Sequence, residues 1–116
     1  MIKRKENLFA EKIQGLCGGK GEVQNIHFLS KEESLGHGRL FAKCIIPPGA
    51  SIGYHQHNGD FETYYILEGS AKMNDNGNEV ILNPGDVQIC EEGTFHGIEN
   101  IGDTDLVYIA TILFKQ

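Results

Sequence analysis

The sequence is a succession of short segments rich in β-branched and aromatic residues, and each segment is closed by a turn signal. Pro47-Pro48-Gly49 ends one of them, because proline cannot donate to a β-ladder. Asp75-Asn76-Gly77 is typical of a hairpin, since Asn and Gly tolerate positive φ. We expect strands at residues 22–29, 39–46, 51–57, 62–67, 70–74, 79–82, 87–90, 95–100 and 106–114. Many short strands with almost no helix predict an all-β sandwich or barrel.

Side-chain alternation predicts which face of a strand is buried. In residues 39–46, alternation places Leu40 and Cys44 on an apolar face, and Arg39 and Phe41 on the opposite one. Residues 106–114 are apolar at nearly every position, so both faces of that strand should be covered. The first twenty residues fit either a turn and a half of helix ending at Gly15 or an extended arm.

Length and composition limit the possible functions. The 116 residues fit one domain, 1–116, with an N-terminal arm over about 1–21. The net charge of −6 argues against nucleic acid as a partner, because phosphate binding needs clustered Lys and Arg. No apolar run spans a bilayer and no signal peptide is visible, so we expect no membrane partner. Three cysteines without a C-x-x-C spacing are expected to be reduced thiols in a cytoplasmic protein.

Four side chains form the candidate metal site. His55 and His57 are two residues apart on one predicted strand and therefore project from the same face. The turn at 58–60 is expected to bring Glu62 back beside them, and His96 opens a strand that can pair alongside. Three imidazoles and one carboxylate are a nitrogen and oxygen ligand set suited to a divalent transition metal.

The spacing of these residues resembles that of the cupin family. The first cupin motif, G-x5-H-x-H-x4-E-x6-G, is matched over 49–69 by Gly49, His55, His57, Glu62 and Gly69. The second motif, G-x5-P-x-G-x2-H-x3-N, is matched over 85–100 by Gly85, Gly93, His96 and Asn100. Glu91 replaces the proline of that motif, which affects a turn rather than a ligand.

The resemblance implies a double-stranded β-helix, or jelly-roll barrel, that holds one divalent metal per chain through His55, His57, Glu62 and His96. Four protein ligands in a six-coordinate shell leave two positions for water or substrate. A closed tetrahedral zinc site has no open position, so Mn or Fe is favoured, with Zn, Ni, Co and Cu as alternatives. Small cupins often dimerise, so a homodimer is expected.

The leading functional hypothesis is a metal-dependent enzyme acting on a small oxygen-rich molecule by decarboxylation, dioxygenation or isomerisation. The candidate substrates are a dicarboxylate such as oxalate, a keto or hydroxy acid, and a sugar derivative, and no catalytic residue is assigned. The alternative is a non-catalytic, metal-dependent binding or sensing protein. A storage or structural role is disfavoured, because clustered histidines and a buried carboxylate are costly to keep without metal.

Other polar residues have simpler interpretations. Asp60 is interpreted as a turn residue, and Glu91 and Glu92 as solvated loop charges. Tyr64 shares the face of Glu62, where its hydroxyl reaches the barrel interior or its ring packs in the core. The residues that match no ligand position are His27, His37, Cys44 and Cys90.

Overall fold

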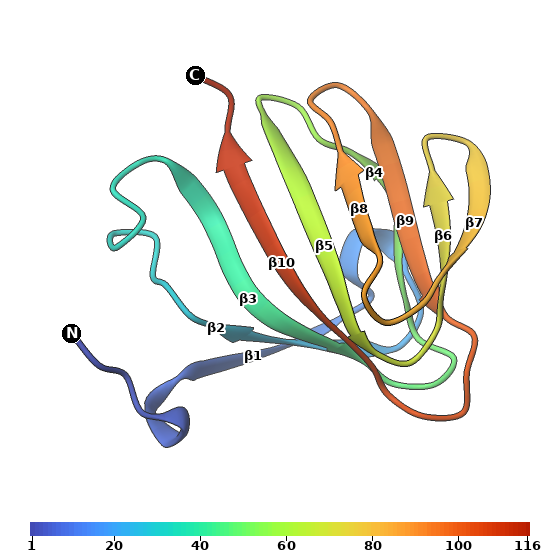
Figure 1. Ribbon diagram of the computed structural model, residues 1–116, viewed down its shortest axis with the longest axis horizontal. Coiled ribbons are helices and arrows are strands. Elements are labelled where there is room, and N and C mark those ends of the chain that lie inside the picture. The colour runs from blue at the N-terminus through green and yellow to red at the C-terminus, as the bar shows by residue number, and fades with distance from the viewer.

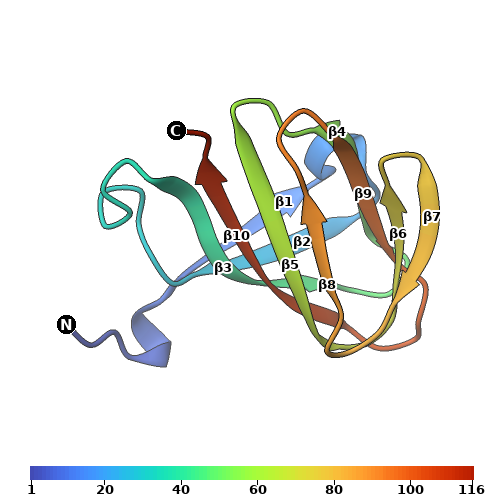
Figure 2. The same cartoon turned by 45° about the horizontal axis from the view of Figure 1, so that its top comes forward.

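Two antiparallel sheets make up the computed structural model, which describes residues 1–116. One sheet has six strands in the order β1-β2-β3-β10-β5-β8, and the other has four in the order β4-β9-β6-β7. The two sheets face each other as the halves of a barrel (Figure 1, Figure 2). The strands are β1 (Phe9–Gln14), β2 (Glu22–His27), β3 (Gly38–Ile46), β4 (Ser51–Gln56), β5 (Asp60–Glu68), β6 (Ala71–Asp75), β7 (Asn78–Leu82), β8 (Val87–Cys90), β9 (Phe95–Asn100) and β10 (Leu106–Phe114). This confirms the predicted all-β jelly roll.

The N-terminal segment is extended, which is the second of the two conformations considered from the sequence. After a short 3₁₀ turn, η1 (Lys5–Asn7), strand β1 pairs with β2 in register, with Ile13 opposite Val23. Gly15 then adopts the left-handed conformation that ends the strand, and a second turn, η2 (Leu16–Gly18), follows it. Pairing with β2 provides partners for the backbone N–H and C=O groups of this segment, which is too short to be stable as a free helix.

The hydrophobic core lies between the two sheets. Fifteen buried residues form one continuous cluster, and Ile46, Ile66, Met73 and Leu106 are among those that are fully buried. Strand β10 lies in the interior of the six-stranded sheet, between β3 and β5. Its inward-facing residues are buried in the core, whereas Ile109 and Leu113 on the outer face are partly buried and exposed, respectively. The expectation that both faces are covered therefore holds for the inner face only.

Two β-bulges alter the direction of side chains near one end of the barrel. In β3, Gly38 and Leu40 pair with consecutive residues of β10, so Arg39 is the extra residue. In β4, Ile52 and His55 pair with Ile98 and His96, so β4 carries one extra residue between them. A bulge reorients the strand locally and breaks the two-residue alternation. The prediction that Arg39 lies on the face opposite Leu40 was wrong, because both side chains line the same cavity.

The asparagine of the second motif, Asn100, has a structural role. Its buried amide nitrogen donates to the carbonyl oxygens of Ile46 and Thr104, both at 2.8 Å. Its side-chain oxygen accepts from the backbone N–H of Gly102 at 2.9 Å. These bonds join the end of β9 to the end of β3 and to the turn before β10.

No helix in the chain has the length and apolar character needed to span a bilayer.

Candidate metal centre

The four residues proposed as metal ligands come together inside the barrel. One donor atom from each of His55, His57, Glu62 and His96 lies within 4.8 Å of every other. The contacts between Nε2 of His57, Nε2 of His96 and Oε1 of Glu62 are each 3.1 Å long. His57, Glu62 and His96 are buried, whereas His55 is partly exposed. The cluster therefore has a closed inner side and a more open side at His55.

The ligand side chains come from both sheets rather than from one hairpin. His55 on β4 lies directly opposite His96 on β9, and His57 follows the end of β4. Glu62 lies on β5, which pairs with β10 and β8 and not with β4. The turn at 58–60 therefore crosses from one sheet to the other, and Glu62 faces the histidines across the barrel. The bulge in β4 lets Ile52 and His55 both point inward, although strict alternation would separate them.

A hydrogen bond at Nδ1 orients each of the three imidazoles. Nδ1 of His55 lies 2.7 Å from the carbonyl oxygen of Gly53. Nδ1 of His57 lies 2.7 Å from Oδ1 of Asp60. Nδ1 of His96 lies 3.0 Å from Oε1 of Gln88. Because all three partners are acceptors, each Nδ1 carries the hydrogen and each Nε2 presents a lone pair. Partners of this kind fix the tautomer of metal-binding histidines.

Two of these partners, Asp60 and Gln88, were not predicted from the sequence. Asp60 was interpreted as a turn residue, but it begins β5, is buried, and joins His57 to Arg39 through an ion pair of 2.9 Å. Gln88 was not singled out; it is buried, and its amide nitrogen donates to Asp75 at 3.1 Å. A buried polar residue in a core-facing position of β8 was the available signal, because such groups require hydrogen-bond partners.

The convergence of acceptors fits a bound cation. Two imidazole lone pairs and a carboxylate oxygen meet at 3.1 Å, and no hydrogen lies between them when each Nδ1 is protonated. Metal bonds of about 2.1 Å at right angles place neighbouring ligand atoms about 3 Å apart. The cluster, together with the family described below, therefore supports a divalent metal.

The electrostatics of the cluster also favour positive charge. Burial alone would lower the pKa of His57, but hydrogen bonds to Glu62 and Asp60 raise it above its ordinary value. Burial would raise the pKa of Glu62, but its side-chain contacts with His57 and His96 lower it. Desolvation lowers the pKa of His55, which keeps that imidazole neutral at the open side. Glu62 is therefore an ionised carboxylate in a site that stabilises a cation.

A cavity of about 270 Å³ opens from the histidine cluster toward the inner face of β2 and β3. His55 and His57 line one end, and Asn25 and Tyr108 also line the cavity. Tyr64, which lines it as well, stacks on His96 with ring centroids 5.0 Å apart. Burial raises the pKa of Tyr64 well above its usual value, so its hydroxyl remains protonated.

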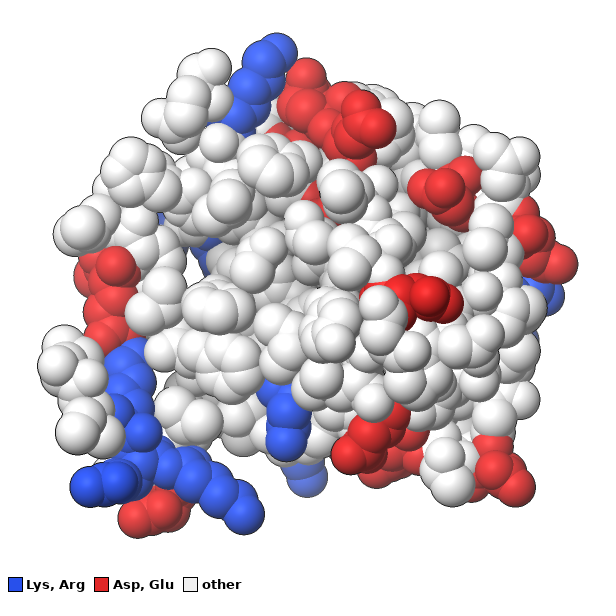
Figure 3. All heavy atoms as spheres, viewed as in Figure 1, with Lys and Arg blue, Asp and Glu red and all other residues white.

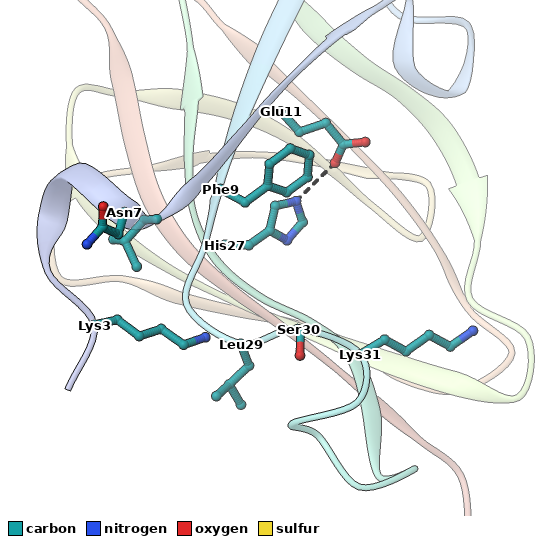
Figure 4. A pocket seen from close by; sticks show the side chains of 9 residues that line it. Lys3, Asn7, Phe9, Glu11, His27, Leu29, Ser30 and Lys31 are labelled. Carbon is teal, nitrogen blue, oxygen red and sulfur yellow. Dashed lines mark hydrogen bonds and ion pairs between the residues drawn. The ribbon is translucent and has the colours of Figure 1, made fainter. Parts of the chain in front are cut away.

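A larger hollow of about 470 Å³ lies outside the barrel, beside the N-terminal arm, and has no metal-binding cluster. It shares Glu11 and His27 with the inner cavity. Nε2 of His27 lies 3.0 Å from Oε1 of Glu11, and the ring of Phe9 stacks on the imidazole (Figure 4). His27, which the sequence left without a role, therefore lies at the boundary between the two spaces.

The other residues considered from the sequence are not among the four cluster residues. Glu92 forms an ion pair of 3.2 Å with Lys115, whose hydrogen bond lowers the pKa of Glu92. Cys44 is buried in the core, and burial raises its thiol pKa to about 12. The thiol of Cys90 is also buried and contacts Thr94.

Comparison with known proteins agrees with this geometry. The cupin domain family matches residues 42–112, which contain all four cluster residues. The chain belongs to the cupin family. This cupin is 46% identical over 113 residues to a protein of Thermotoga maritima named oxalate-binding protein, with 97% of this chain and 93% of that protein aligned.

Solved structures show the same fold. A crystal structure described as a predicted oxalate decarboxylase from Thermotoga maritima superposes with a TM-score of 0.93 at 45% identity, covering 99% of this cupin and all of that chain. The polyketide cyclase RemF from Streptomyces resistomycificus superposes with a TM-score of 0.78 at 21% identity, covering 99% and 81% of the two chains. The second likeness shows the fold alone.

Proposed function

We propose that this cupin binds one divalent transition metal through His55, His57, Glu62 and His96, and uses it to hold a small dicarboxylate such as oxalate. The observation that carries the proposal is the convergence of four donor atoms beside a cavity that two of the four residues, His55 and His57, line. The name of the Thermotoga relative, at 46% identity over nearly the whole chain, supports the choice of oxalate.

The protein's own residues would hold both the metal and the ligand. The metal, for which we favour Mn or Fe, would supply Lewis acidity toward carboxylate oxygens. His57 and His96 are held in place by Asp60 and Gln88, so the site is oriented before ligand arrives. Arg39 lines the cavity while its Nε donates to Asp60, and its positive charge favours an anionic ligand there.

The proposal is tested by metal analysis and calorimetry. Protein purified without added metal should contain one divalent ion per chain, and metal-loaded protein should bind oxalate. His57→Ala should lose high-affinity metal binding and oxalate binding together, because the ion would lose a buried ligand. His37→Ala, in an exposed loop outside the cluster, is the matched control and should retain both. Full metal occupancy in His57→Ala would refute the ligand assignment.

A second candidate function is catalysis by the same metal centre. The Glu11–His27 pair lines the same cavity as His55 and His57 and can exchange protons with a bound molecule. Metal-loaded protein incubated with oxalate, keto acids and sugar derivatives would be followed by NMR for decarboxylation, oxygenation or isomerisation. Turnover that requires metal and is reduced in His27→Gln would support an enzyme. Binding of an acid that remains chemically unchanged would support a binding protein.

A homodimer is part of the proposal, formed through the outer face of the six-stranded sheet. This face exposes the apolar side chains Phe41, Tyr65, Leu67, Val87, Ile89 and Leu113. The middle of the view in Figure 3 carries few charged atoms, so two copies of an acidic chain can meet there without opposing like charges. Light scattering should give twice the chain mass, and Tyr65→Glu with Ile89→Lys should give the monomer mass. A monomeric wild-type protein would refute the dimer.

A cytoplasmic location is also proposed, and the free state of all three cysteines supports it. Reducing conditions keep thiols unpaired in that compartment. Cell fractionation checks the proposal, which fails if the protein is recovered outside the cytoplasm.

A further inference from the structure

The cavity beside the histidine cluster is larger than a two-carbon acid requires. Its volume is about 270 Å³, and one water molecule takes about 30 Å³ in the liquid. Oxalate has six non-hydrogen atoms and a single C–C bond of about 1.5 Å. An oxalate bound at the metal would leave most of the cavity to water.

The far part of the cavity lies well away from the metal cluster along the strands. Glu62 is level with Leu40, since both are opposite Ile112 on β10. Asn25 is opposite Cys44, four residues further along β3. At about 3.3 Å per residue, Asn25 is about 13 Å along the strand direction from the level of Glu62. One small acid cannot contact both.

One polar side chain at this far part has no partner within the protein. The side chain of Asn25 is only 9% exposed, lines the cavity, and forms no hydrogen bond with another protein group. Buried polar groups are normally paired, and an unpaired one costs free energy. Asn25 is therefore available to a ligand that reaches it.

The wall between the cluster and Asn25 is mainly apolar. Nine of the fifteen residues that line the cavity are hydrophobic, including Leu40, Ile52 and Ile112. A sugar derivative would bury hydroxyl groups against this wall without partners. The charged Glu11 also lines the cavity, which disfavours a second carboxylate at the far part. These features select a ligand with an apolar middle and a neutral polar end.

We infer that the cavity takes a 2-oxo or 2-hydroxy acid that is longer than oxalate. The acid head of this ligand chelates the metal, and its carbon chain lies on the apolar wall. Its far end forms a hydrogen bond with Asn25. This inference rests on the proposed function, because the head of the ligand needs the metal. The longer acid gains affinity from two sources, the apolar chain and the bond to Asn25. Each buried methylene contributes about fourfold in affinity, and the hydrogen bond about fivefold.

The inference is tested by calorimetry, which measures the affinity of metal-loaded protein for each of a series of acids. The series contains oxalate, pyruvate, and straight-chain 2-oxo acids of four to eight carbons. Each longer acid is used with and without a terminal hydroxyl group. Affinity should rise with chain length above that of pyruvate and oxalate. At the length that reaches Asn25, the acid with a terminal hydroxyl group should bind about fivefold more tightly than the acid of the same length without it.

Asn25→Leu is the matched variant, since it replaces the amide by an apolar group of similar size. It should lose the preference for the terminal hydroxyl group while keeping metal content and oxalate affinity, which also shows that it folds. If oxalate binds to the wild-type protein more tightly than every longer acid, the inference is overturned and the proposed function stands. If no acid binds the metal-loaded protein, both are overturned. Retention of the hydroxyl preference in Asn25→Leu would exclude Asn25 as the recognition group.

Discussion

Oδ1 of Asp60 lies 2.7 Å from Nδ1 of His57, while Oδ2 of the same carboxylate accepts from Nε of Arg39 at 2.9 Å. One buried carboxylate therefore orients a metal-site imidazole and holds the guanidinium that lines the cavity. Hydrogen bonds from His57 and Arg39 outweigh the effect of burial and lower the pKa of Asp60, so the group is ionised at neutral pH. The site depends on residues beyond the four proposed ligands.

Replacing Asp60 should weaken metal binding without removing a ligand. Asp60→Ala leaves Nδ1 of His57 without its acceptor, and loss of such a partner typically costs 10–100-fold in metal affinity. Competition with a chelator measures the change. Asp103→Ala, in an exposed turn, is the matched control and should bind metal like the wild type. Equal affinity in both variants would contradict the orienting role.

Replacing Gln88 should destabilise the metal-free protein. Gln88→Leu removes the acceptor for the buried Nδ1–H of His96 and the donor to Asp75. An unsatisfied buried donor costs about 1–3 kcal/mol in the free energy of unfolding, which urea denaturation measures. Gln56→Leu is the control, because its amide donates to Gly93 at an exposed position. If the two variants lose the same stability, the special role of Gln88 is excluded.

Metal occupancy should fall as the pH is lowered. Imidazole binds metal only in its neutral form, so protons compete with the ion. Because hydrogen bonds to Glu62 and Asp60 raise the pKa of His57, competition should begin above the ordinary histidine pKa of about 6.5. Elemental analysis after equilibration at stepped pH values measures the release. An apparent metal affinity, measured against a competing chelator, that stays constant down to pH 5 would contradict histidine ligation.

An added methyl group at Gly53 should disturb the side of the barrel at which η2 packs on β4. A Cβ at Gly53 would overlap the carbonyl oxygen of Cys17, which is backbone and cannot simply rotate away. Gly53→Ala should therefore cost about 1–3 kcal/mol of stability, measured by urea denaturation.

Gly102→Ala provides the comparison, since its Cβ would meet only the side-chain oxygen of Asn100 at 3.5 Å, an ordinary contact. That change should stay within about 0.5 kcal/mol of the wild type. If Gly53→Ala is as stable as Gly102→Ala, the close approach of η2 to β4 has no energetic importance.

The sequence by itself determined the fold class, the nine strands expected from residue 22 onward, and the four clustered side chains. Strand alternation and turn chemistry are local properties of the chain. The motif spacing indicated which three histidines and which glutamate are the candidate metal ligands. The pairing of the N-terminal arm was open, because Leu8, Phe9 and Ile13 fit a helix or a strand until β2 is available to pair with them.

Only the tertiary structure decided how Arg39, Asp60 and Gln88 act. The bulge in β3 turns Arg39 toward Asp60, and a register shift of this kind depends on the neighbouring strand rather than on local sequence. His96 and Gln88 meet because β9 and β8 lie in facing sheets, and the cavity that reaches Asn25 exists only once both sheets are closed. Hydrogen bonds between distant segments, and the space left between side chains, arise from packing, which alternation along one strand cannot specify.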